Sequence, residues 1–192
     1  YSTQIKKSYA ELSQILLNII RESGGNDLIQ ADFCAGANNV SGGNVLKSNF
    51  KIAKDCQLNS ANCFAPHNEY RSYNSRNRKR TSAIGGYSIT TASGTAISLY
   101  CYGNYGLDNP VASMYIDTNG KKGPNIVGYD FFRVYIYPEG VIDGYYINRD
   151  CRVNSNCYEG DDVNLPNGLT QAQRREYNFN TWCSDPDEAD GC

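Results

Sequence analysis

The sequence has 192 residues, which is enough for one domain with a hydrophobic core and too few for two large domains. Its formal net charge of −2 excludes the concentrated basic surface that coating nucleic acid requires, so we expect no nucleic-acid partner. No run of about 18 apolar residues is present, so we expect nothing in this sequence to cross a bilayer.

Residues 1–24 predict a long amphipathic helix that ends at Gly24-Gly25. Its apolar positions recur at spacings of three and four, with two more that widen the stripe: Ile5, Tyr9, Leu12, Leu16 and Ile19, then Ile15 and Ile20. The pattern begins almost at the first residue. We therefore expect residues 1–24 to be the C-terminal half of a longer N-terminal helix.

Residues 25–86 show little periodicity and predict a loop-rich, disulfide-tied linker, with short helical pieces around Asn44 to Lys54. Residues 87–150 predict an antiparallel sheet, because alternating runs are separated by turn residues such as Ser93-Gly94 and Pro138-Glu139-Gly140. The runs are 87–91, 95–102, 111–117, 131–137 and 141–147. A helix followed by such strands favours the α+β class, in a single domain spanning 1–192 that closes with a disulfide-tied region at 151–192.

Eight cysteines spread over most of the chain indicate disulfides formed in an oxidising compartment. Zinc is disfavoured, because the near pairs are six to nine residues apart and His67 is the sole histidine. Eight cysteines allow 105 pairings. We favour the three local pairs and the pair that then remains: Cys56–Cys63, Cys151–Cys157, Cys183–Cys192 and Cys34–Cys101.

The stretch DTNGKKGPNIVGYDFF at 117–132 predicts a structured loop before a strand. It fails as an EF-hand, because lysines stand where that loop needs an oxygen ligand and a glycine. A looser calcium cage of Asp117, Asn119 and Asp130 is an alternative, although two lysines in the loop would repel the cation. We favour a turn in which the two carboxylates accept backbone N–H bonds that tie the loop ends.

Two charged clusters have a functional and a plain interpretation. The acidic one would bind calcium or be a solvated end, and we favour the solvated end. The basic one has interleaved tyrosines, as in single-strand nucleic-acid binders, but we favour a solvated loop or a salt-bridging patch for a neighbouring subunit. The acidic cluster consists of Asp185, Asp187, Glu188 and Asp190, and the basic cluster consists of Arg71, Arg76, Arg78, Lys79 and Arg80.

Catalysis finds little support in the sequence. His67 would have to serve any Ser-His-Asp or Cys-His arrangement, and no G-x-S-x-G elbow or phosphate-binding loop is present. We therefore expect no enzyme; an enzyme that uses His67 is the weakest alternative.

Together these features resemble the type IV pilins and the pseudopilins of type II secretion. The specific match lies in 117–140, which is similar to the signature D-x-N-G-x-x-x-P-N-x-x-G-x-D-x-F of pilin-like proteins. The matching positions are Asp117, Asn119, Gly120, Pro124, Asn125, Gly128, Asp130 and Phe132. The segment YSTQIKKSYAELSQILLNII is similar to the second half of the family's long N-terminal helix.

The resemblance implies a long helix packed on a roughly four-stranded antiparallel sheet, and a structural role by polymerisation with other pilin or pseudopilin subunits. The missing apolar helix half would anchor the precursor in the inner membrane, with a periplasmic head that later joins a cell-surface fibre or a periplasmic pseudopilus. The helix residues expected to pack partly on the protein's own sheet and partly on neighbours are Ile5, Leu12, Ile15, Leu16 and Ile19. No cofactor is expected, although some pseudopilins bind calcium in a C-terminal loop. The alternative is a secreted disulfide-rich adhesin or carbohydrate-binding module.

Overall fold

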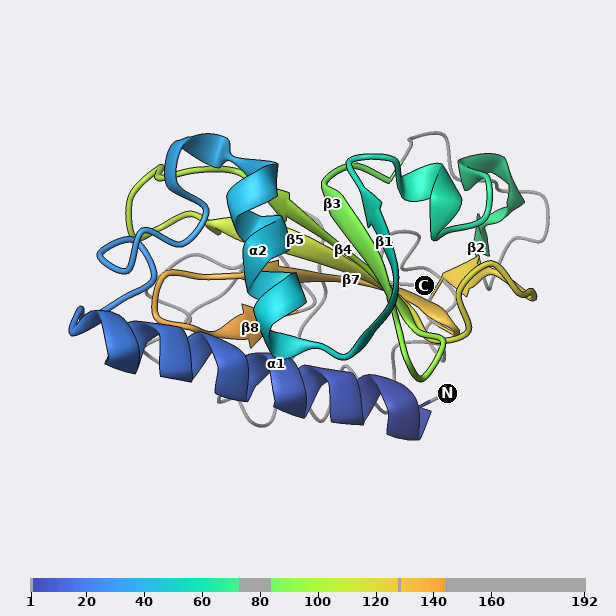
Figure 1. The fold of residues 1–192 in the computed structure, drawn as a ribbon, viewed down its shortest axis with the longest axis horizontal. Coiled ribbons are helices and arrows are strands. Elements are labelled where there is room, and N and C mark those ends of the chain that lie inside the picture. Colours follow the sequence, from blue (N-terminus) through green and yellow to red (C-terminus); the bar gives the residue numbers. More distant parts are fainter. Residues whose placement is uncertain (1, 73–83, 128, 144–192) are drawn as a thin grey trace, which may run out of the picture.

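The structure is a computed structural model that describes residues 2–72, 84–127 and 129–143 (Figure 1). This part of the chain has the expected α+β fold, with a long N-terminal helix and a mostly antiparallel sheet. The helices are α1 (Ser2–Ser23) and α2 (Asn39–Asn49), with three 3₁₀ turns, η1 (Ala35–Ala37), η2 (Ser60–Asn62) and η3 (His67–Glu69). The strands are β1 (Ile52–Gln57), β2 (Arg71–Ser72), β3 (Tyr87–Thr91), β4 (Ala96–Cys101), β5 (Ala112–Asp117), β6 (Ile126–Val127), β7 (Phe131–Ile136) and β8 (Ile142–Asp143).

The sheet has more strands than the roughly four expected. Seven lie in the order β1-β3-β4-β5-β7-β6-β2, and β8 pairs with β7. The neighbours in β1-β3-β4-β5-β7 pair antiparallel, and so do β7 and β8. Strand β6 pairs parallel with both β7 and β2. One of the additional strands is β1, whose sequence lacks a clear alternation of polar and apolar residues. It pairs with the edge of β3 that the predicted hairpins would leave without hydrogen-bond partners.

The segment 25–86 has more regular structure than its sequence indicated, because the short helical pieces expected around Asn44 to Lys54 are a longer helix that begins earlier and is followed by the strand β1. Residues 39–49 form α2, which begins where the Asn38 side chain accepts hydrogen bonds from the backbone N–H groups of Val40 and Ser41. Two glycines weaken the helical signal in the sequence, but packing requires them. A Cβ on Gly43 would lie 2.3 Å from the Tyr87 ring, so α2 approaches β3 more closely than any larger residue would permit.

Both helices pack on the same face of the sheet. The main core joins α1 and α2 to the inward-facing residues of β3, β4, β5, β7 and β8. A second, smaller core lies on the opposite face, where residues 63–70 cover Tyr115 and Phe131.

Each core contains one of the two disulfides of the described residues. Cys34–Cys101 closes a separation of 67 residues, and Cys56–Cys63 closes a separation of 7, so both of these predicted pairs are confirmed.

Candidate functional site

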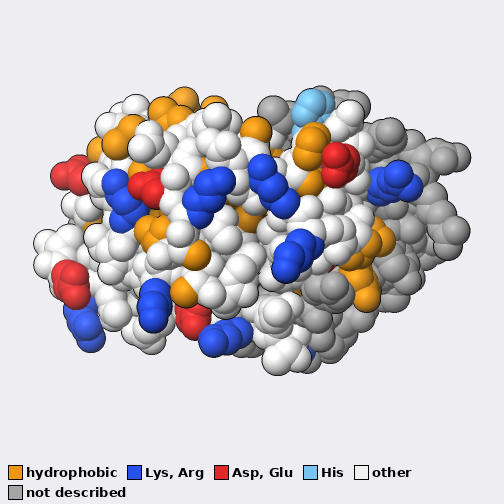
Figure 2. Space-filling model, turned by 45° about the vertical axis from the view of Figure 1, so that its right-hand side comes forward, with side chains coloured by type: hydrophobic (Ala, Val, Ile, Leu, Met, Phe, Trp, Pro, Cys, Tyr) orange, Lys and Arg blue, Asp and Glu red, His pale blue; other side chains and the backbone are white. Residues whose placement is uncertain are grey.

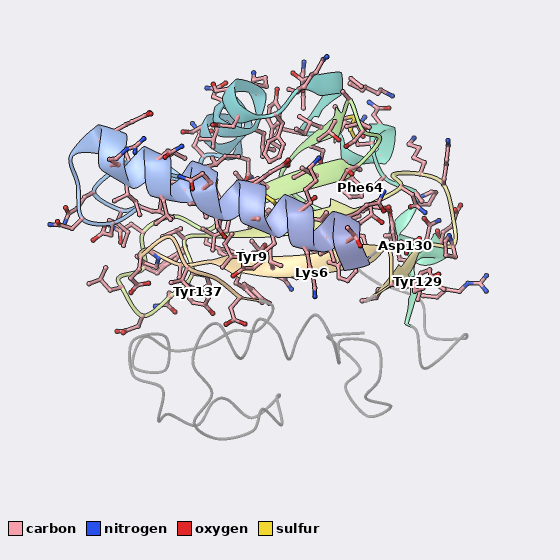
Figure 3. The ribbon with its side chains drawn as sticks, turned by 90° about the horizontal axis from the view of Figure 1, so that it is seen from below. Lys6, Tyr9, Phe64, Tyr129, Asp130 and Tyr137 are labelled. Carbon is pink, nitrogen blue, oxygen red and sulfur yellow. A yellow bond between two sulfur atoms is a disulfide. The ribbon has the colours of Figure 1, made fainter. Side chains whose placement is uncertain are left out.

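The inner stripe of α1 is part of the protein's own core. Ile5, Leu12 and Leu16 are at most 2% exposed, and the Tyr9 hydroxyl donates a 2.6 Å hydrogen bond to the carbonyl of Ile142. Figure 3 shows α1 lying against the sheet, with Lys6 and Tyr9 about one turn apart along the helix. These three residues thus pack on the protein's own sheet, as was expected of part of the set, and a side chain buried in this way has little surface left for a neighbour. Contact with neighbouring subunits stays a prediction for the less buried members, Ile15 and Ile19.

The accessible apolar surface of α1 is at other positions. Leu17 is 52% exposed, while Ile15, Ile19 and Ile20 are partly buried at the margins of the stripe. The exposed polar side of the helix carries both signs of charge, including Lys7 and Glu11, whose charged groups are 3.8 Å apart. Figure 2 shows basic and acidic side chains dispersed among uncharged ones over one side of the molecule. Any helix contact with another copy would centre on Leu17 rather than on Leu16.

The loop 117–130 is held by its two carboxylates, as the turn prediction requires. Asp130 accepts hydrogen bonds from the backbone N–H groups of Asn125 and Ile126 and from the amide Nδ2 of Asn119. Asp117 accepts one from the backbone N–H of Asn119. Figure 3 places Asp130 at the opposite end of β7 from Tyr137. The carboxylates thus tie both ends of the loop, which fixes the entry into β7.

Asp117 and Tyr70 form a buried pair that sequence reasoning missed. The Tyr70 hydroxyl donates a 2.7 Å hydrogen bond to Asp117 Oδ2, and both residues are fully buried. Burial raises the pKa of the Asp117 carboxyl group to about 7, the hydrogen bonds from Tyr70 and Asn119 lower it, and the nearby Asp130 raises it. Burial, followed by the charge of Asp117, raises the pKa of Tyr70. The pair links the second core to the end of β5.

The loop fits the structural role better than the calcium cage of Asp117, Asn119 and Asp130. Asp130 already accepts three N–H donors, which occupy most of its lone pairs. Among residues 2–72, 84–127 and 129–143, no group of three or more His, Cys, Asp and Glu side chains is arranged to hold a metal ion. In the described part of the chain, Asn119 Oδ1 and Asn125 Oδ1 are buried without a hydrogen-bond donor, and the structural role does not account for them.

A cluster of tyrosines surrounds Arg133 on the sheet face opposite the helices. Arg133 pairs with Tyr115 in the register of β5 and β7, and its guanidinium carbon lies 5.3 Å from the Tyr115 ring and 4.7 Å from the Tyr135 ring. Its Nη2 donates a 2.8 Å hydrogen bond to the Tyr102 hydroxyl, which donates to Ser113. The sequence signal is the alternation of Tyr, Ser and Arg along these strands, a pattern that strand propensity alone also explains.

Several predicted features lie outside the described residues. These are Gly128, the bridges Cys151–Cys157 and Cys183–Cys192, the acids Asp185, Asp187, Glu188 and Asp190, and the bases Arg76, Arg78, Lys79 and Arg80. Of the other motif positions, Gly120 takes the positive φ of 65° expected for a turn glycine, and Phe132 is buried in the main core. His67 is exposed on η3.

In the described part of the chain, no helix is both long and apolar enough to pass through a bilayer.

No family model, no curated protein and no solved structure matches this chain.

Proposed function

We propose that this chain is a structural subunit that polymerises through α1, as type IV pilins and type II secretion pseudopilins do. Support comes from the pairing of a 22-residue N-terminal helix with an antiparallel sheet, and from the D-x-N-G to D-x-F loop that orders the entry into β7. In this role the head is a rigid globule tied by disulfides, and the helix supplies the contacts between copies.

One observation carries the proposal: α1 has more apolar surface than its own sheet covers. The inner stripe is buried, yet Leu17 remains 52% exposed and Ile15 is only partly buried. Burying the exposed half of this leucine would contribute about 1 kcal/mol, and a contact repeated in every copy would add this amount at each subunit of a fibre. Partners are other copies of this chain or related subunits, and the precursor would be held by the inner membrane through an upstream segment.

The test compares two adjacent leucines in the full-length gene product within its own host. Leu17→Glu should reduce incorporation into sheared or sedimented fibres by about tenfold or more, while the melting temperature of the purified domain stays the same. Gln14→Glu adds the same charge at an exposed position of the same helix and should leave fibre yield unchanged. Leu16→Ala should lower the melting temperature, because it opens a cavity in the core.

Normal fibre yield with Leu17→Glu, in a protein whose melting temperature is unaltered, would refute assembly through this surface of α1. Loss of fibres with Gln14→Glu to the same degree would show that added charge alone is responsible, and would also refute the proposal.

A further inference from the structure

The guanidinium of Arg133 has unused hydrogen-bonding capacity. Arginine carries five N–H donors. Nη2 donates one to the Tyr102 hydroxyl, Nε is buried without an acceptor, and Nη1 is not buried and has no acceptor within residues 2–72, 84–127 and 129–143. No carboxylate of the described residues lies within ion-pairing distance of Arg133.

A half-buried cation of this kind favours an anionic partner. The π faces of Tyr115 and Tyr135 stabilise the guanidinium by about 0.5 to 1 kcal/mol each, which is less than an oxyanion in hydrogen-bond contact provides. The rings also hold the side chain in place, so little rotamer entropy remains to be lost when a ligand binds. Because the guanidinium is planar, its donors match the paired oxygens of a carboxylate or a phosphate, and the single charge of a carboxylate is the one that a single cation balances.

The surroundings of Arg133 indicate what carries that carboxylate. Tyr100 is 40% exposed, and its ring packs edge-on at 5.4 Å against Tyr102, whose hydroxyl accepts the hydrogen bond from Arg133. It therefore offers an accessible aromatic face separated from the cation by one ring. The Tyr102 hydroxyl, on a side chain that is only partly buried, adds a polar group. One cation flanked by neutral aromatic and hydroxyl groups suits a ligand whose carboxylate is joined to a flat apolar face and to hydroxyls, as in a uronic acid. It suits an acidic peptide, which has neither the flat face nor the hydroxyls, less well.

We propose that Arg133 and Tyr100 form a binding site for a carboxylate-bearing glycan, in which Arg133 holds the carboxylate of a uronic acid and Tyr100 stacks on a sugar ring. This site lies on the sheet face opposite α1, so it does not depend on assembly through that helix and would stay outward when the helix contacts other copies. A fibre subunit with such a site would adhere to acidic polysaccharide.

The test is isothermal titration calorimetry of the chain with a galacturonate tetrasaccharide, a neutral galactose tetrasaccharide of equal length, and a glutamate tetrapeptide. We expect binding of the galacturonate at millimolar or lower concentration, and at least about tenfold weaker binding of the other two. Arg133→Gln should weaken galacturonate binding about tenfold or more, and Arg133→Lys should restore part of it. Arg21→Gln, at an exposed position of α1, is the charge-matched control and should bind as the wild type does.

Tyr100→Ala keeps the test decisive if the Arg133 variants fold poorly, because Tyr100 is half exposed and its loss should reduce affinity several-fold without lowering the melting temperature. Absence of galacturonate binding by the folded wild type overturns the proposal. Equal binding of the neutral tetrasaccharide overturns the role of the carboxylate, and tighter binding of the glutamate peptide overturns the glycan in favour of an acidic protein partner.

Discussion

We expect Asp117 to make the free energy of unfolding depend on pH. Burial raises the pKa of its carboxyl group to about 7 from an ordinary value of 3.8, despite the hydrogen bond from Tyr70. Because the folded-state pKa lies above the unfolded-state pKa, folding strengthens proton binding. The resulting stabilisation is complete below about pH 4 and is lost as the pH rises through about 7. About three pKa units at 1.36 kcal/mol each correspond to roughly 4 kcal/mol, as an upper limit.

The assay is urea unfolding followed by circular dichroism between about pH 4 and pH 8, with the disulfides intact. Asp117→Asn is neutral at every pH, and its side-chain oxygen can still accept the Tyr70 hydroxyl. We therefore expect the wild type to lose up to about 4 kcal/mol relative to this variant between the two ends of the range. Glu22→Gln, at an exposed position of α1, should show no such pH-dependent difference from the wild type. If wild type and Asp117→Asn follow parallel pH profiles, Asp117 is not the titrating group and the reasoning fails.

Two further predictions concern packing and the disulfides. Gly43→Ala should destabilise the protein by about 3 kcal/mol, because the added Cβ would overlap the Tyr87 ring. Gly94→Ala, at a position with open space but a positive φ of 89°, should cost about 1 kcal/mol. Thermal unfolding that ranks the two variants in the opposite order would contradict the close approach of α2 to β3. Replacing Cys34 and Cys101 together by serine should lower the free energy of unfolding by about 4 kcal/mol, and replacing Cys56 and Cys63 should lower it by about 2 kcal/mol. The difference is expected because the disulfide that closes the longer loop confines the unfolded chain more. Equal losses of stability in urea unfolding would show that chain entropy does not set the difference.

Local sequence was enough to predict the elements whose signals are complete within a few residues. Helix α1 follows from apolar spacing and ends at its glycine pair, and the bounds of β3 and β7 follow from alternation between turns. Gly94 and Gly140 take the positive φ angles that their turns require. The local pair Cys56–Cys63 was predictable for the same reason, since seven residues hold the two cysteines close in any compact arrangement.

Tertiary structure decided the features that need partners distant in sequence. Helix α2 keeps Gly42 and Gly43 because β3 and β4 pack closely against it, and β1 becomes a strand because β3 has an open edge. The apolar spacing placed Leu16 on the stripe of α1 and left Leu17 off it, but how far each is covered depends on where the sheet lies, so only the structure shows that Leu16 is buried and Leu17 accessible. The tyrosine cluster around Arg133 exists because cross-strand register brings side chains from β4, β5 and β7 together on one face, and register is a property of the assembled sheet.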